Sequence, residues 1–144
     1  MKELKGKILL AYIAGIIDGE GSISLHIRRE HGYKTCGLTI CVANTNEWLI
    51  NLLKIQFTGH IYFRESFIPK HKDAWQWTIT GKKAAEFIKL IIPYLQIKRH
   101  QAELALQFQS RKRLGRASKE NWQTTKILEE ADRILMASYN KRGK

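Results

Sequence analysis

The stretch Ile13-Ala-Gly-Ile-Ile-Asp-Gly-Glu-Gly21 is an apolar, small-residue segment that ends in a carboxylate between two glycines. Ala11, Gly15 and Gly19 recur every four residues, so on a helix of about 3.6 residues per turn they form one nearly flat stripe. The other faces of this helix are also apolar, which predicts burial on all sides. A flat stripe lets a second helix approach closely, and the chain has one such segment. We therefore expect it to pack against its own copy in a homodimer.

The end of this helix is the expected place for chemistry. If two copies cross about a two-fold axis, two Glu20 carboxylates come close together. Like charges at the negative ends of two helix dipoles repel each other, which favours a bound divalent cation or a proton. The alternative for Glu20 is a turn residue after a helix that Gly19 or Gly21 caps. The expected dimer interface contains Ala11, Ala14, Gly15, Asp18 and Gly19.

Asp18 is open to two interpretations. It could belong to the acidic site, or it could cap a neighbouring helix across the pairing surface, since it lies just inside the same helix end. We favour the structural role.

Length, composition and charge narrow the class of protein. The chain has 144 residues, 44% of them hydrophobic, which fits one domain over 1–144 with a core at about 8–110 and a helical extension at about 117–140. Its formal charge of +12 points to a polyanionic partner, for which nucleic acid is the natural candidate. The sequence has neither a long apolar span nor a basic amphipathic helix with an aromatic face, so we expect no membrane partner.

The expected location is intracellular, wherever the nucleic-acid target resides, whether cytoplasm, nucleoid or organelle. No small-residue cleavage site follows the apolar run near the start, so secretion is not expected. Cys36 and Cys41 are an odd number of residues apart in a predicted strand, which directs them to opposite faces and excludes a local disulfide.

After Gly21 the hydrophobic period changes from that of a helix to that of a strand. Apolar and polar residues then alternate in two predicted hairpins, and Asn44 or Thr45 is the expected cap of the helix between them. The expected elements after the first helix are strands at about 22–30 and 35–42, a helix at about 45–57, strands at about 61–67 and 75–80, and helices at about 82–92, 96–111 and 118–139.

This order predicts an α+β fold with an αββαββα core, a four-stranded antiparallel sheet and C-terminal helices. Helices on one face leave the other face open, and hydrogen-bonding side chains on it suit the base edges of the DNA major groove. The basic clusters would contact phosphates without reading sequence. The residues expected to contact DNA are Ser22, Ser24, His26, Arg28, Glu30, Tyr33, Lys34, Thr35, Thr39, Tyr62, Arg64, Ser66, Lys70, Lys72, Gln76 and Thr78.

Three ordered motifs resemble those of the LAGLIDADG homing endonucleases of the single-motif, homodimeric type. They are the 13–21 stretch quoted above, Val42-Ala-Asn-Thr-Asn46 and Pro93-Tyr-Leu-Gln-Ile-Lys-Arg-His-Gln-Ala102. The resemblance implies a curved sheet that forms a DNA-binding saddle. It also implies that Glu20 and the Gly19 carbonyl hold Mg²⁺ or another divalent cation. Lys98 matches a catalytic-pocket lysine, and Asn44 matches a polar pocket residue whose alternative role is a plain helix cap.

The function implied is site-specific cleavage of both strands of a long, nearly palindromic duplex by metal-dependent phosphodiester hydrolysis. Such an enzyme serves intron or intein homing. An alternative on the same scaffold is a binding protein without cleavage, either an RNA-splicing maturase or a DNA-binding regulator. RNA therefore stays a possible partner at this point. A weaker alternative is a basic dimerisation module.

Overall fold

The first helix passes directly into the first strand without a loop. In the computed structural model, which describes residues 4–30, 33–70, 72–114 and 119–141, helix α1 (Gly6–Glu20) is followed at once by strand β1 (Gly21–Glu30). A Cβ atom at Gly21 would lie 2.9 Å from Ile17 Cα, closer than side chains tolerate. The missing side chain at Gly21 therefore lets the backbone turn immediately out of the helix.

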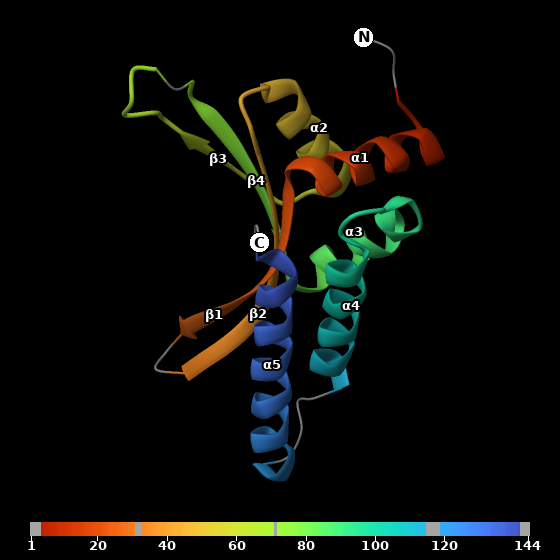
Figure 1. Cartoon of the computed structure of the whole chain (residues 1–144), viewed down its shortest axis with the longest axis vertical. Coiled ribbons are helices and arrows are strands. Elements are labelled where there is room, and N and C mark those ends of the chain that lie inside the picture. Colours follow the sequence, from red (N-terminus) through yellow and green to blue (C-terminus); the bar gives the residue numbers. More distant parts are fainter. Residues whose placement is uncertain (1–3, 31–32, 71, 115–118, 142–144) are drawn as a thin grey trace.

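The strands form one antiparallel sheet in the order β1-β2-β4-β3. Strand β2 (Tyr33–Asn44) pairs with β1, and β4 (Ala74–Thr80) pairs with both β2 and β3 (His60–Arg64). Figure 1 shows the hairpin of β1 and β2 and the hairpin of β3 and β4 reaching away from the helices and diverging. The predicted α+β architecture and its αββαββα order are confirmed.

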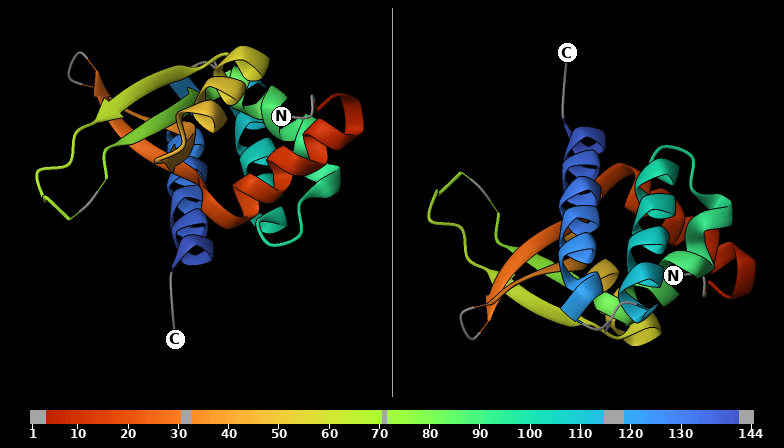
Figure 2. Two further views of the ribbon diagram at one scale, coloured as in Figure 1. Left: turned by 90° about the horizontal axis from the view of Figure 1, so that it is seen from above. Right: turned by 90° about the horizontal axis from the view of Figure 1, so that it is seen from below.

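The helices all lie on one side of the sheet (Figures 1 and 2). After α1 these are α2 (Glu47–Phe57), α3 (Gly81–Ile91), α4 (Arg99–Leu114) and α5 (Lys119–Asn140), with the short 3-10 helix η1 (Ile92–Tyr94) after α3. The apolar residues of alternate strand positions pack against them. The largest fully buried side chains are Trp77, Phe87, Phe108, Ile13, Ile17, Ile23, Leu38, Ile40, Ile50, Leu53, Ile88 and Ile91.

Polar contacts hold the C-terminal helix α5 against the core. Arg111 on α4 forms an ion pair of 2.6 Å with the buried Asp132 carboxylate. Near the end of α5, Asn140 Nδ2 donates to the Ile23 carbonyl of β1 at 2.7 Å. Helix α5 therefore covers the β1 side of the sheet.

Two local predictions are wrong. The cap of α2 is Asn46, whose side chain accepts a hydrogen bond from the Trp48 amide, rather than Asn44 or Thr45. Strand β3 ends at Arg64, and Phe67, expected to continue its apolar alternation, is 96% exposed. A loop whose Ser66 amide donates to Asp73 at 2.8 Å replaces the end of the expected strand.

The two cysteines lie on opposite faces of β2, as predicted, and both are free. Cys36 is buried beneath the helices, and this burial raises the pKa of its thiol to about 11. Among the described residues, no helix is long and apolar enough to cross a membrane.

Candidate active site and nucleic-acid interface

Glu20 occupies the C-terminal end of α1, where it is exposed to solvent. Asn44, at the end of β2, donates from Nδ2 to Glu20 Oε2 at 2.5 Å. The other end of the Asn44 amide is also occupied, because Oδ1 accepts a hydrogen bond from the Asn46 backbone at 2.7 Å. Asn44 is thus held on both sides and orients the Glu20 carboxylate.

Asp18, two residues before the end of α1, binds the segment before α4 in its own chain. Its carboxylate accepts hydrogen bonds from the backbone amides of Gln96, Ile97 and Lys98 at 2.8, 3.1 and 2.9 Å. These amides precede α4 and would otherwise lack partners. The expectation of a cap across the dimer surface is therefore corrected: Asp18 has the structural role, but within one subunit.

The same contact brings Lys98 to the end of α1. Lys98 Nζ donates to the Asp18 carbonyl oxygen at 2.8 Å, and the side chain is half-buried. A cation near the last carbonyls of a helix is favoured by the helix dipole. Glu20, Asn44, Asp18 and Lys98, which are far apart in the sequence, thus meet around one helix end.

Removal of the Asp18 carboxylate should destabilise the fold. Asp18→Ala leaves three backbone amides without their acceptor, so we expect a loss of about 2 kcal/mol in the free energy of unfolding. Urea unfolding at one fixed protein concentration measures it. Asp73→Ala is the control, because that carboxylate accepts one loop amide at an exposed position and should cost less than about 0.5 kcal/mol. Equal losses in both variants would contradict this role for Asp18.

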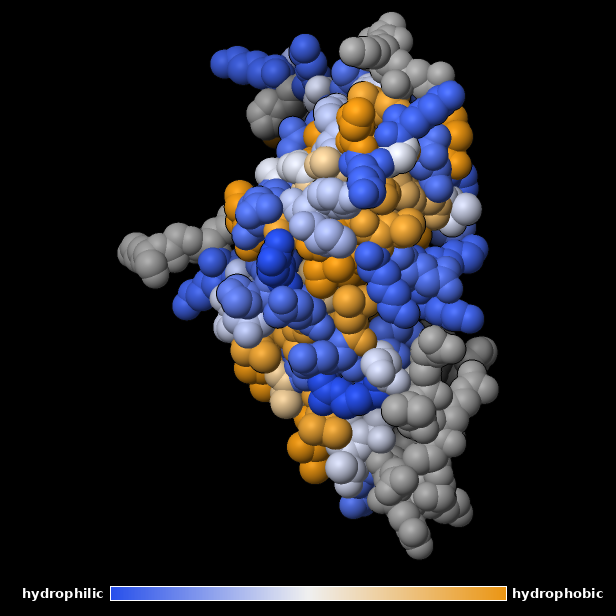
Figure 3. Space-filling model, turned by 90° about the vertical axis from the view of Figure 1, so that its right-hand side faces the viewer, coloured by the Kyte–Doolittle hydropathy of each residue, from blue (hydrophilic) through white to orange (hydrophobic). Residues whose placement is uncertain are grey.

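The small-residue stripe of α1 faces solvent in the single chain. Ala11, Gly15 and Gly19 are exposed, and a Cβ atom at Gly15 or Gly19 would meet nothing within 4 Å. The subunit itself therefore does not require glycine at these positions. Beside the stripe, Ile8 and Tyr12 are 70% and 40% exposed. Figure 3 shows hydrophobic atoms between hydrophilic ones on this helix-covered side of the molecule.

Ala14 is a correction to the expected interface. Its side chain is fully buried within the subunit, because it belongs to the buried face of α1 with Leu9, Ile13 and Ile17 and not to the exposed stripe. Ile8 and Tyr12 replace it at the surface and were not predicted. Their spacing of four residues from each other, parallel to the stripe, is the signal that would have identified them.

One chain offers an incomplete set of metal ligands. Among the described residues, no group of three or more His, Cys, Asp or Glu side chains could hold a metal ion. The carboxylate of Asp18 is committed to backbone amides, which leaves Glu20 as the exposed carboxylate of this helix end. A hard divalent cation would need oxygen ligands from elsewhere to complete its shell.

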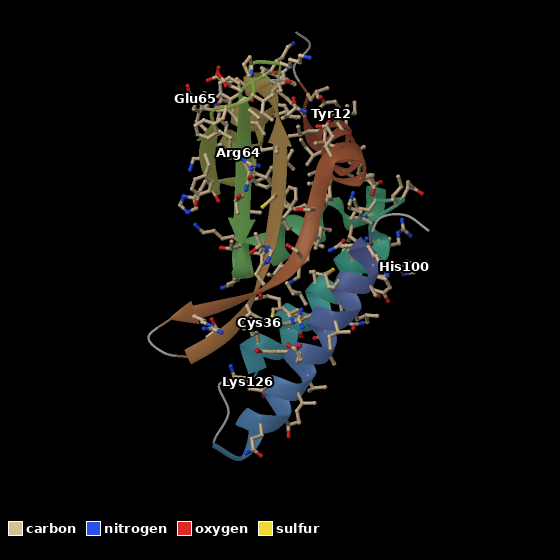
Figure 4. The ribbon with its side chains drawn as sticks, turned by 60° about the vertical axis from the view of Figure 1, so that its left-hand side comes forward. Tyr12, Cys36, Arg64, Glu65, His100 and Lys126 are labelled. Atoms are coloured by element: carbon tan, nitrogen blue, oxygen red, sulfur yellow. The ribbon has the colours of Figure 1, made fainter. Side chains whose placement is uncertain are left out.

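The face of the sheet opposite the helices carries most of the side chains expected to contact DNA. Cross-strand pairs share a face, and the register pairs Ser24 with Thr39, Cys41 with Thr78, and Tyr62 with Gln76. Figure 4 turns this face forward and labels Arg64 on it. The expected residues that the register places on this face are Ser22, Ser24, His26, Thr35, Thr39, Tyr62, Arg64, Gln76 and Thr78.

Thr39 is on this face but is not accessible. Its exposed fraction is 5%, and its buried hydroxyl has no hydrogen-bond partner within the described residues. Strand β2 lies inside the sheet, where Ser24 and Thr80 flank Thr39 on both sides. We therefore remove Thr39 from the residues that could touch a base.

The other residues expected to contact DNA do not lie on the described face of the sheet. Ser66, Lys70 and Lys72 belong to the loop between β3 and β4, outside the sheet. The side chains of Arg28, Glu30, Tyr33 and Lys34 lie outside the described part of the structure. His60, exposed at the start of β3 and paired with Thr78, was missed, although its alternation with Tyr62 and Arg64 would have identified it.

The sequence matches no protein-family model and no curated protein. Its structure, however, has the fold of the LAGLIDADG homing endonucleases. The homing endonuclease I-CvuI in complex with its target superimposes with a TM-score of 0.77 at 19% sequence identity, over 94% of this chain and 83% of that chain. The archaeal intron-encoded homing endonuclease I-Vdi141I complexed with DNA gives 0.74 at 14% identity, over 94% of this chain and 86% of that chain.

A longer protein of this fold matches over only part of its length. The LAGLIDADG homing endonuclease I-GzeII in complex with a DNA target gives a TM-score of 0.70 at 17% identity. The match covers 86% of this chain but 43% of that chain. One copy of this chain therefore corresponds to less than half of I-GzeII.

Proposed function

We propose that this protein is a homodimeric, site-specific DNA endonuclease that cuts both strands of a long, nearly palindromic duplex. The observation that carries the proposal is the position of the exposed Glu20 carboxylate. It lies where the exposed stripe of α1 meets the open face of the sheet, in a fold shared with homing endonucleases that were crystallised with DNA. Intron or intein homing is the corresponding biological role.

Two features support a homodimer. The stripe of Ala11, Gly15 and Gly19 is exposed in the single chain, although an apolar surface of this kind is costly in water. The match to less than half of I-GzeII supports the proposal that two copies of this chain form the complete assembly. Pairing along the stripe about a two-fold axis would bring the two Glu20 side chains together.

The donor set fits Mg²⁺ or another hard divalent cation shared between subunits, because carboxylate and backbone carbonyl oxygens are the ligands that such ions prefer. We assign Glu20 and the Gly19 carbonyl of each subunit to this site. When bound, the cation would activate a water molecule and stabilise the leaving 3′ oxygen of the phosphodiester. Asn44 contributes by fixing the Glu20 carboxylate.

Lys98 is the proposed electrostatic partner of the scissile phosphate. Its ammonium group lies at the end of α1 in the free protein, where it binds the Asp18 carbonyl. A positive charge fixed beforehand beside a reacting phosphate stabilises the negative charge that develops during displacement. Each of the two Lys98 side chains would support one of the two strand cleavages.

The side chains on the open face of the sheet would recognise the DNA sequence. Its hydroxyl, imidazole, amide and guanidinium groups match the donors and acceptors of base edges in the major groove. Loop cations such as Lys70 and Lys72 would contact phosphates, which makes affinity fall steeply with salt. Two-fold symmetry then predicts equivalent half-sites about one helical turn, roughly 10 bp, apart.

One experiment tests cleavage, symmetry and target together. The purified protein is incubated with a library of randomised duplexes and Mg²⁺, and the cut ends are sequenced. We expect a single, nearly palindromic site with both strands cut, and no cutting when EDTA removes the divalent cation. Specific binding of a structured intron RNA or of duplex DNA without any cleavage would overturn the proposal in favour of a maturase or a regulator.

A further inference from the structure

A chain of hydrogen-bonded side chains crosses strands β2, β4 and β3 on the open face. Arg64 Nη1 donates to Gln76 Oε1 at 3.3 Å. Gln76 Nε2 in turn donates to Thr78 Oγ1 at 3.3 Å and to Cys41 Sγ at 3.6 Å. Cys41 Sγ and Thr78 Oγ1 lie 3.4 Å apart. The Gln76 amide is therefore engaged at both of its ends.

The chemistry of these groups determines which way the Gln76 amide points. A guanidinium group can only donate hydrogen bonds, so the oxygen of the Gln76 amide must face Arg64. The amide nitrogen then faces Thr78 and Cys41, whose oxygen and sulfur atoms can both accept. The opposite orientation would place two donors against each other. Gln76 is thus held in one orientation before any ligand arrives.

The register explains why Arg64 leans toward Gln76. The residue directly opposite Arg64 is Ala74, whose side chain is too small to support a guanidinium group. Gln76 is the diagonal neighbour two residues along β4, within reach of long side chains. Figure 4 shows Arg64 on the open face, near the end of the sheet away from Cys36.

Gln76 uses one guanidinium donor, and among the described residues no other hydrogen bond of the exposed Arg64 side chain is seen, so the remaining donors can bind a ligand. A guanidinium group presents donors in a planar fork, which pairs with O6 and N7 of guanine in the major groove. Fixing the fork beforehand lowers the entropy lost on binding. By contrast, the Gln76 amide nitrogen already donates to Thr78 and Cys41, so it lacks the donor that pairing with adenine requires.

We propose that Arg64 reads a guanine in each half-site, and that Gln76 is a positioning residue for Arg64 and does not read a base. Thr78 and Cys41 fix Gln76 by accepting hydrogen bonds from its amide nitrogen. This inference rests on the proposed function, because it requires a duplex on the open face. Arg64 and Gln76 were both expected to contact DNA. In this proposal only Arg64 contacts a base, and Gln76 holds Arg64 in place.

The test is selection of bound duplexes from a randomised library, in EDTA so that no strand is cut, with four forms of the full-length protein. The wild type should prefer guanine at one position of each half-site by roughly ten- to a hundredfold. Arg64→Ala should abolish that preference. Gln76→Met, which keeps the length of the side chain but cannot hold the guanidinium group, should weaken it roughly three- to tenfold at the same position and alter no other.

Lys70→Ala is the matched control, because it removes an exposed loop cation instead of a base reader. It should weaken binding to all sequences about equally and change no preferred base. The midpoint of thermal unfolding is measured for each variant, and a midpoint close to that of the wild type would show that the fold is kept.

The outcomes separate this inference from the proposed function. Loss of a preferred adenine at a different position in Gln76→Met would show that Gln76 reads a base, and would overturn the inference alone. An unchanged base preference in Arg64→Ala would do the same. A wild type without any preferred duplex sequence would overturn both the inference and the proposed function.

Discussion

Glu20→Gln is expected to abolish DNA cleavage while specific binding of the target is kept. The amide oxygen of glutamine can still accept the hydrogen bond from Asn44, so the end of α1 should keep its structure. What is lost is the negative charge that a hard divalent cation requires. We expect the cleavage rate to fall by about 100- to 1,000-fold or more, the range seen when an electrostatic stabiliser is removed.

The measurement is a single-turnover cleavage assay beside a binding titration, with target duplex and Mg²⁺ at fixed ionic strength. Affinity for the target should change by less than about threefold, because Glu20 is one charge in a strongly basic chain with a formal charge of +12. Glu86→Gln, which neutralises an exposed carboxylate on α3, should cut at the wild-type rate. Nicking of either strand at an undiminished rate by Glu20→Gln would refute the assignment of Glu20 as a metal ligand.

Gly15→Leu is expected to separate the dimer into subunits and thereby remove cleavage. Within one chain the new side chain has free space, and leucine is a better helix former than glycine by roughly 0.5–1 kcal/mol. Across a two-fold interface the same side chain is inserted twice between closely approaching helices. Overpacking costs about 1–3 kcal/mol per site, and the dimer has two such sites. The dissociation constant of the dimer should therefore rise by about 30-fold or more.

Analytical ultracentrifugation over a range of protein concentrations measures this effect, and circular dichroism shows whether the subunit stays folded. Two controls distinguish pairing from folding. Glu103→Leu adds the same side chain at an exposed position of α4 and should leave the dimer intact. Gly21→Ala should instead destabilise the subunit, since its Cβ would meet Ile17. A wild type that sediments as a monomer at micromolar concentration would contradict the whole dimer proposal.

The elements that sequence analysis located well are those with a clear local period. The alternation after Gly21 correctly assigned Ile23, Leu38 and Trp77 to the core face and Ser22 and Arg64 to the open face. Where the period was interrupted, the prediction was wrong. Phe67 matched the alternation, but the strand had already ended at Arg64, and side-chain hydrogen bonds of Ser66 and Asp73 formed a loop.

The candidate site shows the same division. Glu20, Asn44 and Lys98 could be named from motifs that resemble a known family, yet no local pattern indicates that Asn44 holds Glu20 or that Lys98 reaches the Asp18 carbonyl. Those contacts join residues 24 and 80 positions apart in the chain.

The amino-acid sequence by itself determined the stripe along α1, the change from helix to strand at Gly21, and which side chains face the open side of the sheet. Each of these follows from local backbone geometry, because side chains share a face every second residue on a strand and about every fourth residue on a helix. Only the tertiary structure decided that Thr39 is buried, that Asp18 accepts the amides before α4 in its own subunit, and that Gln76 accepts a hydrogen bond from Arg64. Those outcomes depend on which strands and helices become neighbours, and burial and hydrogen-bond partners are properties of that arrangement.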